Sequence, residues 1–464
     1  MGSFLHVIQP DRMRVWVVGE SGDRLEVLMS EQSELVEGCQ RAVNLRDRRE
    51  RLPTCTNEIR NDAGRSLVDR RTLLLSAAGG LAVGALWRPA SAAGNVLTVA
   101  AQRGRRFDPV LARQLRQALR DALSDPATSF PGAILHVHSP TLGAWTGVAG
   151  LSRLMPATRM HPHDLFRAGS IVKPFVSAAV LLLAERGRLS LDDRLTDVLP
   201  SSVTGPFENS GEITVRMLLG HRSGIPEWDS EAVDVEVARN PAKVWKVSEF
   251  LALAAAQPPV FAPGTGFFYS NTDYNLLGLI IERITGRSWR REVTRRVIGP
   301  LGLTRTALPA PGNRSIKGPH AHGYGQLDGK PVDLTHVDPS FAGAAGASAL
   351  ITTVDDLTRF LDALFNGGLF RHRRTLRQML QLAPAQGEGG LVGYGLGIER
   401  RALPGGVELP GGVELIGHLG GAPGYRSYVG RVRPPDATIS FALNTQEDPT
   451  PLVIPVVRAI ATRR

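Results

Sequence analysis

The chain has 464 residues, 42% of them hydrophobic and 21% charged, so it can build a sizeable core without disulfides or metals. Its formal net charge is +10, yet the arginines are scattered and no aromatic-basic platform accompanies them, which argues against nucleic-acid binding. An ordinary basic protein, or one attracted to an anionic cell envelope, accounts for this charge. Both cysteines, Cys39 and Cys55, lie near the N-terminus, which excludes a disulfide framework and a cysteine-based metal site beyond them.

Residues 65–93 have the layout of a secretory signal. The basic pair Arg70 and Arg71 precedes an apolar stretch rich in Ala and Gly, and Ala-Ser-Ala follows at 90–92. The basic pair resembles a twin-arginine signal, and the apolar stretch is shorter than the roughly 20 residues of a membrane span. We therefore expect a protein exported to the periplasm, the cell envelope or the medium. An uncleaved anchor helix is the alternative.

The signal segment lies unusually far from the start of the chain. Residues 1–64 are charged, mixed in composition and weakly periodic. We expect them to be either a poorly ordered extension or the result of a start site assigned too far upstream. The catalytic domain is therefore expected to comprise residues 94–464.

Hydrophobic periodicity predicts an α+β domain. The helices expected are 107–127, 170–186, 274–285, 353–369 and 451–461, and the strands expected are 133–138, 144–149, 394–400, 413–418, 425–432 and 438–444. With strands at both ends and helices between them, we expect one antiparallel sheet built from the N- and C-terminal strands. Helices would flank this sheet, and a mostly helical region would be inserted at about 190–340.

The first candidate motif is Ser170-Ile-Val-Lys173, at the start of a strongly apolar helix. Positions three apart face the same side of a helix, so the lysine amine would lie beside the serine hydroxyl. A serine is a useful nucleophile only when a base takes its proton, and burial lowers a lysine pKa toward the neutral form. A helix-capping serine with an incidental lysine is the alternative.

The second and third motifs are weaker when each is considered alone. Tyr269-Ser-Asn271 precedes a helix, where a phenol can relay protons if a cation lowers its pKa and an amide can hold a lysine. His418-Leu419-Gly420-Gly421 ends a strand, where a backbone N–H can serve an oxyanion and glycine lets substrate approach. Ordinary capping and turn roles explain either one equally well.

Together the three motifs resemble the set of the serine β-lactamase and penicillin-binding-protein superfamily, which has Ser-x-x-Lys, then Tyr-x-Asn or Ser-x-Asn, then Lys/His-Thr-Gly. The stretches 166–170, 217–224 and 268–278 resemble the family around these motifs, and the last is most similar to secreted serine D-alanyl-D-alanine carboxypeptidases. The likeness covers about 130–444. Tyr269 is typical of the class C β-lactamase-like branch.

The resemblance implies an acyl-enzyme mechanism with no metal or other cofactor. Ser170 would be the acylated nucleophile, Lys173 and Tyr269 would transfer protons, and Asn271 would orient substrate and lysine. His418 would occupy the place of the cation in the third motif, and Leu419, Gly420 and Gly421 would border the substrate. The N–H groups of Ser170 and Gly421 would form the oxyanion hole.

Leu419 departs from the family pattern, which has a threonine there whose hydroxyl helps bind a substrate carboxylate. The departure favours neutral esters or amides, and histidine at 418 is less typical of efficient β-lactamases. The function best supported is D-alanyl-D-alanine carboxypeptidase-like hydrolysis of cell-wall peptides. An esterase or amidase, a β-lactamase acting on β-lactams, and a catalytically weak penicillin-binding envelope protein are the alternatives.

Two other site types are disfavoured. Five histidines lack the spacing of a metal site and are expected to be loop and surface residues: His161, His163, His320, His322 and His336. No Gly-x-Ser-x-Gly surrounds Ser170 or Ser348, which argues against an α/β-hydrolase.

Overall fold

The computed structural model describes residues 106–463, with gaps at 126–127, 129, 328, 346–348, 388–389 and 404–412, and the backbone of three short strands before them. The chain divides into two compact units, Met1–Ala90 and Ser91–Arg464. In the first unit, β1 (Met13–Val18) and β2 (Arg24–Met29) pair as an antiparallel hairpin. Apart from this hairpin, the expected leader and signal segment, 1–64 and 65–93, lie outside the described residues.

A ten-stranded antiparallel sheet forms the centre of the second unit, in the order β11-β12-β13-β14-β15-β16-β4-β5-β3, with β6 added to β5. Its strands are β3 (Thr98–Ala100), β4 (Gly132–Ser139), β5 (Gly143–Arg153), β6 (Thr158–Arg159), β11 (Ala383–Gly387), β12 (Leu391–Tyr394), β13 (Glu399–Arg401), β14 (Glu414–Ala422), β15 (Tyr425–Arg433) and β16 (Ala437–Leu443). Because β16 pairs directly with β4, the two ends of the domain share one sheet, which confirms the expected α+β layout.

The helical elements lie mostly between these two sets of strands, as expected. They are α3 (Pro109–Ser124), η1 (Gly169–Ile171), α4 (Val172–Ala184), α5 (Leu195–Val198), α6 (Ser201–Thr204), α7 (Val215–Leu219), α8 (Glu231–Arg239), α9 (Val247–Ala255), α10 (Asn271–Thr285), α11 (Trp289–Val293), η2 (Thr294–Ile298), η3 (Gly343–Ala345), α12 (Val354–Phe365), α13 (Arg373–Met379) and α14 (Thr450–Ala461). Two-stranded pairs join β7 (Phe166–Arg167) to β10 (Ile351–Thr352) and β8 (Tyr324–Leu327) to β9 (Lys330–Asp333). Within the described residues, no helix combines the length and apolar character that a membrane crossing requires.

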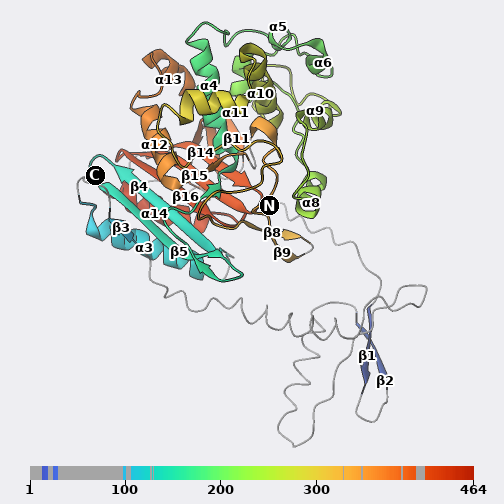
Figure 1. Ribbon diagram of the computed structural model, residues 1–464. Coiled ribbons are helices and arrows are strands. Elements are labelled where there is room, and N and C mark those ends of the chain that lie inside the picture. The colour runs from blue at the N-terminus through green and yellow to red at the C-terminus, as the bar shows by residue number, and fades with distance from the viewer. Residues whose placement is uncertain are drawn as a thin grey trace, which may run out of the picture. The chain divides into compact units, whose positions relative to one another are not determined.

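Helices cover both faces of the sheet (Figure 1). Side chains alternate between the faces along each strand, so in β4 Leu135 packs with α3 and α14, whereas Ile134 packs with the core around α4, α10 and α12. The larger of these cores lies between the sheet and the inserted helices. The nucleophile helix α4 runs through it, which explains why this helix is apolar on every side.

The expected single strand 394–400 is wrong. The chain instead turns back between β12 and β13, with Tyr394 paired to Glu399 and the Gly395 N–H donated to the Ile398 carbonyl. Gly397 lies at φ +79, where a side chain would be strained, so the turn requires this glycine. β13 begins at Glu399, opposite Gly417, so among the described residues no strand pairs with β14 on that side beyond Gly417.

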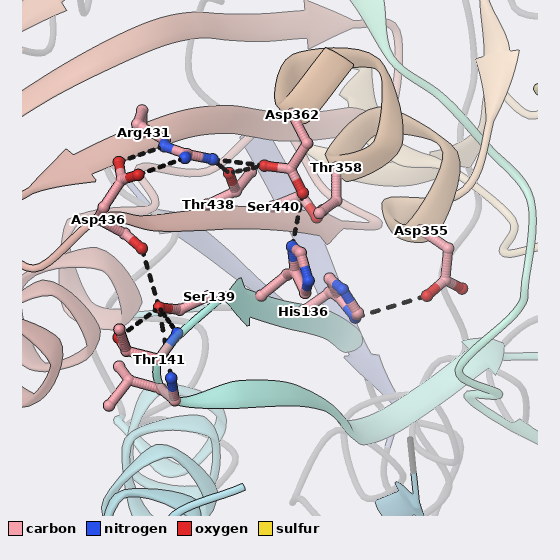
Figure 2. A network of polar contacts seen from close by, with 12 residues as sticks. His136, Ser139, Thr141, Asp355, Thr358, Asp362, Arg431, Asp436, Thr438 and Ser440 are labelled. Carbon is pink, nitrogen blue, oxygen red and sulfur yellow. Dashed lines mark hydrogen bonds and ion pairs between the residues drawn. The ribbon is translucent and has the colours of Figure 1, made fainter. Parts of the chain in front are cut away.

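A partly buried polar network joins α12 to the sheet (Figure 2). The guanidinium of Arg431, in β15, lies 2.5 Å from Asp362 of α12 and 2.6 Å from Asp436 in the turn before β16. Nearby, the hydroxyls of Thr358 and Ser440 are 2.8 Å apart. These contacts hold α12 against β15 and β16.

Candidate active site

The nucleophile lies in a tight turn that only glycine permits. Gly169 has φ +56, and a Cβ on it would lie 2.2 Å from the carbonyl oxygen of Gly421 and 2.8 Å from its nitrogen. The η1 turn therefore packs directly against β14. Ser170, the next residue, is partly exposed at the start of α4. Its hydroxyl is accessible to a substrate held along β14.

Lys173 is the base candidate, and its side chain is fully buried. Its Nζ lies 3.0 Å from Ser170 Oγ and 2.7 Å from Asn271 Oδ1. Burial lowers the pKa of Lys173 to about 7, against the opposing charges of Glu227 and Glu399. At neutral pH a large fraction of this amine is therefore unprotonated and can accept the serine proton.

Asn271 is held in place through its backbone N–H, which Glu227 binds. It is the first residue of α10, and its N–H donates to Glu227 Oε2 at 2.6 Å. On either side of it, the hydroxyls of Ser270 and Thr272 both donate to the carbonyl of Pro226. The second motif is thus attached to the 226–227 segment, and Glu227 is a functional residue that motif reasoning did not identify.

Tyr269 contacts the nucleophile, since its hydroxyl is hydrogen-bonded with Ser170. Lys173 Nζ lies 4.8 Å from the centre of its ring. Burial raises the pKa of Tyr269 well above its ordinary value, and the Glu399 carboxylate adds to this effect. The lowered pKa that would suit a tyrosinate base is not found. The phenol is protonated and suits the role of proton donor or relay.

A buried pair beneath Tyr269 positions its ring. His221, at φ 56, packs its ring against the tyrosine ring with the centroids 4.4 Å apart and the planes tilted by 39°, and its Nδ1 lies 3.0 Å from Asp273 Oδ2. The backbone N–H of Ser270 also lies 3.3 Å from this Nδ1, and a neutral aspartate can donate the proton of the shared contact. Burial agrees with this, because it raises the pKa of Asp273 well above normal and lowers that of His221 well below.

His418 is a neutral imidazole rather than the cation expected from the third motif. Its Nδ1 donates to the Leu419 carbonyl at 2.6 Å, and its Nε2 faces the Tyr394 hydroxyl at 3.1 Å. Burial lowers the pKa of His418 to about 4, although the Glu399 carboxylate opposes this. The Nε2 atom of the ring therefore accepts from Tyr394, and the positive charge beside the nucleophile at lower pH is that of Lys173.

The geometry of β14 points the Gly421 N–H toward substrate. The Leu419 N–H donates to Glu399 Oε2 at 2.9 Å, on the β13 side. The direction of N–H groups repeats every two residues along a strand, so the Gly421 N–H points to the same side. In the described part of the chain, β13 pairs with β14 only as far as Gly417, which leaves this edge open to a substrate. The Gly421 N–H and the nearby Ser170 N–H thus suit an oxyanion hole.

Glu399 accepts a hydrogen bond from β14, and its negative charge favours the protonated form of Lys173. Besides the Leu419 N–H, it accepts Arg401 Nε at 2.7 Å. Burial would raise the pKa of Glu399, but Arg401 and His418 outweigh it and keep the pKa below its ordinary value. This buried carboxylate was not identified from sequence, because nothing in a lone Glu-Arg-Arg strand points to a site.

The structure thus brings together the five candidate residues, Ser170, Lys173, Tyr269, Asn271 and His418, with Leu419, Gly420 and Gly421 along the adjacent strand. The histidines considered as ligands lie elsewhere, in two ring clusters, 161 with 163 and 320 with 322 and 336. Among the described residues, no set of three or more His, Cys, Asp or Glu side chains is arranged to hold a metal ion.

A protein-family model described as Beta-lactamase matches residues 112–461. Among curated proteins, penicillin-binding protein 4* of Bacillus subtilis is 26% identical over 336 residues, covering 68% of this chain and 67% of its own length. Penicillin-binding protein 4 of Amycolatopsis lactamdurans is 29% identical over 198 residues, and the match spans only 50% of that protein.

Two solved structures are similar over most of this chain. A D-stereospecific amidohydrolase from a Streptomyces species has a TM-score of 0.65 and 32% identity, covering 74% of this chain and 97% of its own. A D-amino acid amidase from Ochrobactrum anthropi, complexed with L-phenylalanine amide, has a TM-score of 0.64 and 26% identity, covering 76% and 99%.

Proposed function

The chain belongs to the beta-lactamase family and is a serine hydrolase of the β-lactamase and penicillin-binding-protein superfamily, and on that basis we propose that it cleaves amide bonds whose acyl part is a D-amino acid residue. The lead activity is D-alanyl-D-alanine carboxypeptidase-like hydrolysis of cell-wall peptides. The 3.0 Å approach of Lys173 Nζ to Ser170 Oγ, with the lysine pKa near 7, carries the acyl-enzyme mechanism. The similarity to a D-stereospecific amidohydrolase and a D-amino acid amidase supports the D-configured acyl part.

The proposed reaction begins with proton transfer from Ser170 to neutral Lys173. The serine oxygen attacks the carbonyl carbon of the scissile amide, and the developing oxyanion accepts the N–H groups of Ser170 and Gly421. Tyr269, protonated and beside the nucleophile, passes a proton to the leaving amine, and its own proton is restored from Lys173. The C–N bond breaks, which leaves an ester on Ser170.

Water then completes the turnover. Lys173 is again neutral once its proton has left with the amine, so it can take a proton from the attacking water. The ester C–O bond breaks, Ser170 regains a proton, and the D-configured acid is released. Asn271 holds the lysine through both halves of the reaction, since its Oδ1 lies 2.7 Å from Nζ.

The second candidate is an amidase of free D-amino acid amides. Leu419 favours it, because the leucine side chain supplies no hydroxyl for a substrate carboxylate. The similarity to a D-stereospecific amidohydrolase and to a D-amino acid amidase also supports it. Both candidates share the D-configured acyl part and differ in whether the leaving group carries a carboxylate.

A substrate panel on residues 94–464 tests the proposal. It compares diacetyl-L-Lys-D-Ala-D-Ala, D-alanine amide, L-alanine amide, a p-nitrophenyl ester and fluorescent penicillin, for the wild type and for Ser170→Ala. We expect D-substrates to be preferred and the variant to lose about 10³-fold or more of kcat. Preference for the L-amide would contradict the D-residue proposal, and full activity in the variant would contradict the nucleophile. Turnover of penicillin, or stable labelling without peptide hydrolysis, would indicate a β-lactamase or a penicillin-binding protein instead.

We also propose export before action on the cell envelope, based on the Arg70–Arg71 pair and the Ala-Ser-Ala pattern at 90–92. N-terminal sequencing of the exported product is the test. The expected start lies near residue 93, and a product that retains Met1 would exclude a cleaved signal.

A further inference from the structure

Most of the positive charge of this protein lies in three short segments, residues 185–188, 282–296 and 371–377. Together they contain 12 arginines and three carboxylates, a net charge of +9, against +10 for the whole chain. All of these arginines except Arg290 and Arg296 are exposed. The excess charge is therefore concentrated in a small part of the chain and faces solvent there.

The three segments meet at the C-terminal end of α4. The Glu185 carboxylate, just after α4, accepts the N–H groups of Arg371 and His372 at 3.1 Å each, which attaches the start of α13. Arg188 donates from Nη2 to the carbonyl of Ile284, near the end of α10, at 2.9 Å. After α10, the chain continues into α11 and η2, which both pack against α4 (Figure 1). The segments thus form one surface, which we call the arginine face.

The carboxylates of the arginine face neutralise little of its charge. Glu292 is buried and lies within 3.6 Å of the guanidinium groups of three arginines, Arg287, Arg295 and Arg296. One negative charge is therefore shared among three positive ones. Glu185 is engaged by backbone N–H groups and by the hydroxyl of Thr375. A large positive charge is left over on the surface.

Helix stability explains only part of this arrangement. Cations near the C-terminal end of a helix are favourable, which accounts for Arg186 after α4 and Arg283 in the last turn of α10. In contrast, α13 begins with Arg373 and Arg374, where the helix dipole disfavours positive charge, and no acidic residue lies in its first turn. Arginines that the fold does not require indicate a binding surface.

We propose that the arginine face docks the protein on a membrane that carries anionic phospholipids. Guanidinium groups bind phosphates through paired hydrogen bonds, and clusters of basic residues are attracted to anionic lipid surfaces. A membrane presents a dense, flat array of phosphates, so it can engage arginines from three segments at once. Single-stranded nucleic acid would instead need exposed rings for stacking, and Trp289, the only Phe, Tyr or Trp in these segments, is 3% exposed.

Docking at this face leaves the catalytic centre clear of the membrane. The helix α4 begins just after Ser170 and ends at Ala184, beside the arginine face. Its length of 13 residues corresponds to about 20 Å, more than the Debye length of roughly 8 Å at physiological salt. Docking should therefore determine where the protein acts without changing the turnover of a small neutral ester. The inference goes beyond the proposed function, because it does not depend on which bond is cleaved.

The test measures sedimentation of the full chain with vesicles of phosphatidylcholine alone and with vesicles that contain about 30% phosphatidylglycerol as well. The ratio of the two binding constants isolates the contribution of charge, because apolar contacts made elsewhere in the chain contribute to both. The wild type should bind the anionic vesicles far better, and this preference should disappear when the salt is raised to about 1 M. The variant Arg373→Gln/Arg374→Gln/Arg377→Gln should lower the ratio by about 10- to 100-fold.

Two further variants show whether the face acts as a unit. Arg186→Gln/Arg283→Gln removes charge from the other two segments and should lower the ratio by about 5- to 20-fold. Arg153→Gln/Arg159→Gln/Arg239→Gln is the control, because it changes three exposed positions of β5, β6 and α8. It should change the ratio less than about twofold, since distant charges are screened. Thermal unfolding shows that each variant has folded.

Equal weakening in the control variant would overturn the proposal, because overall charge would then attract the membrane. A wild-type chain that binds both kinds of vesicle equally, or that binds soluble polyphosphate but no vesicle, would also overturn it. An effect of the α13 variant alone would contradict a surface built from three segments. Failure of the proposed hydrolytic activity would leave these binding results unchanged, so the two proposals fail separately.

Discussion

Glu227 accepts the backbone N–H of Asn271 at 2.6 Å, while the side-chain oxygen of the same asparagine lies 2.7 Å from Lys173 Nζ. The carboxylate therefore acts on the base in two ways, by placing the amide that holds the lysine and by opposing, through its charge, the effect of burial on the lysine pKa. The effect of this carboxylate on the lysine pKa can be measured through the pH dependence of the reaction, in the wild type and in a Glu227 variant.

The first prediction concerns the wild-type pH profile. Lys173 must be neutral to accept a proton, and its pKa lies near 7, so activity should rise with pH through that value. We expect kcat/KM for a neutral ester to fall about tenfold per pH unit well below 7 and to level off above 8. The profile is measured from pH 5 to 9. A rise centred near 10, the ordinary range of a lysine, would show that the base is not this buried amine.

The second prediction is that Glu227→Gln moves this rise to lower pH. Removing a negative charge near Lys173 destabilises its protonated form, so its pKa should fall further. The comparison uses the same neutral ester, with Glu231→Gln as the control, because Glu231 is an exposed carboxylate on neighbouring α8. We expect the Glu231 variant to keep the wild-type profile. A rise that stays in place, or moves upward, in the Glu227 variant would refute the electrostatic role.

The third prediction tests the proton assigned to Asp273. If its carboxyl is neutral and donates to His221, an asparagine can make the same contacts, including that from Ser223 at 2.5 Å. Asp273→Asn should therefore unfold within a few degrees of the wild type. Asp273→Ala removes one hydrogen bond from each of two buried groups, the Ser223 hydroxyl and His221 Nδ1, and should cost about 2–4 kcal/mol. Thermal unfolding distinguishes them, and an asparagine variant as unstable as the alanine variant would indicate a charged aspartate instead.

The fourth prediction compares the two carboxylates around Arg431. This guanidinium is 1% exposed, the Asp362 side chain 16% and the Asp436 side chain 50%. Asp362→Ala should destabilise the domain by about 3–5 kcal/mol, since it leaves a buried charge short of a partner and also removes the contact to His138. Asp436→Ala should cost less, because water reaches that side of the pair. Urea unfolding at pH 7 measures both, and equal losses would mean that exposure does not control the energetics of this network.

The sequence was sufficient to predict which residues meet. Ser170, Lys173, Tyr269, Asn271 and His418 were identified from their types and order, and the structure brings them together as the resemblance implies. Few other residue types can perform the chemistry of these five residues. Short motifs that contain them therefore point to the site.

The electrostatic state of the site could not be predicted from the motifs. Tyr269 has a raised pKa and His418 a strongly lowered one because both are buried, and burial depends on segments distant in the sequence. Glu227 and Glu399 were missed for the same reason. Each acts through a contact across 20 residues or more, to Asn271 and to Leu419, and neither has a local pattern that suggests it. The incorrect strand at 394–400 has a local cause, since Gly397 permits a turn that hydrophobic periodicity alone does not reveal.

The pairing of β16 with β4 places Leu443 opposite Ala133, so two strands more than 300 residues apart meet at the middle of the sheet. Contacts between such distant segments slow folding, because a long loop must close before the contact stabilises anything. During synthesis, β4 and β5 must wait for the last strands to emerge, and until then the edge of β4 is exposed to pairing with other chains. The pairing of β16 with β4, which unites the two ends of the domain, is therefore the folding step before which a newly made chain is most vulnerable to aggregation.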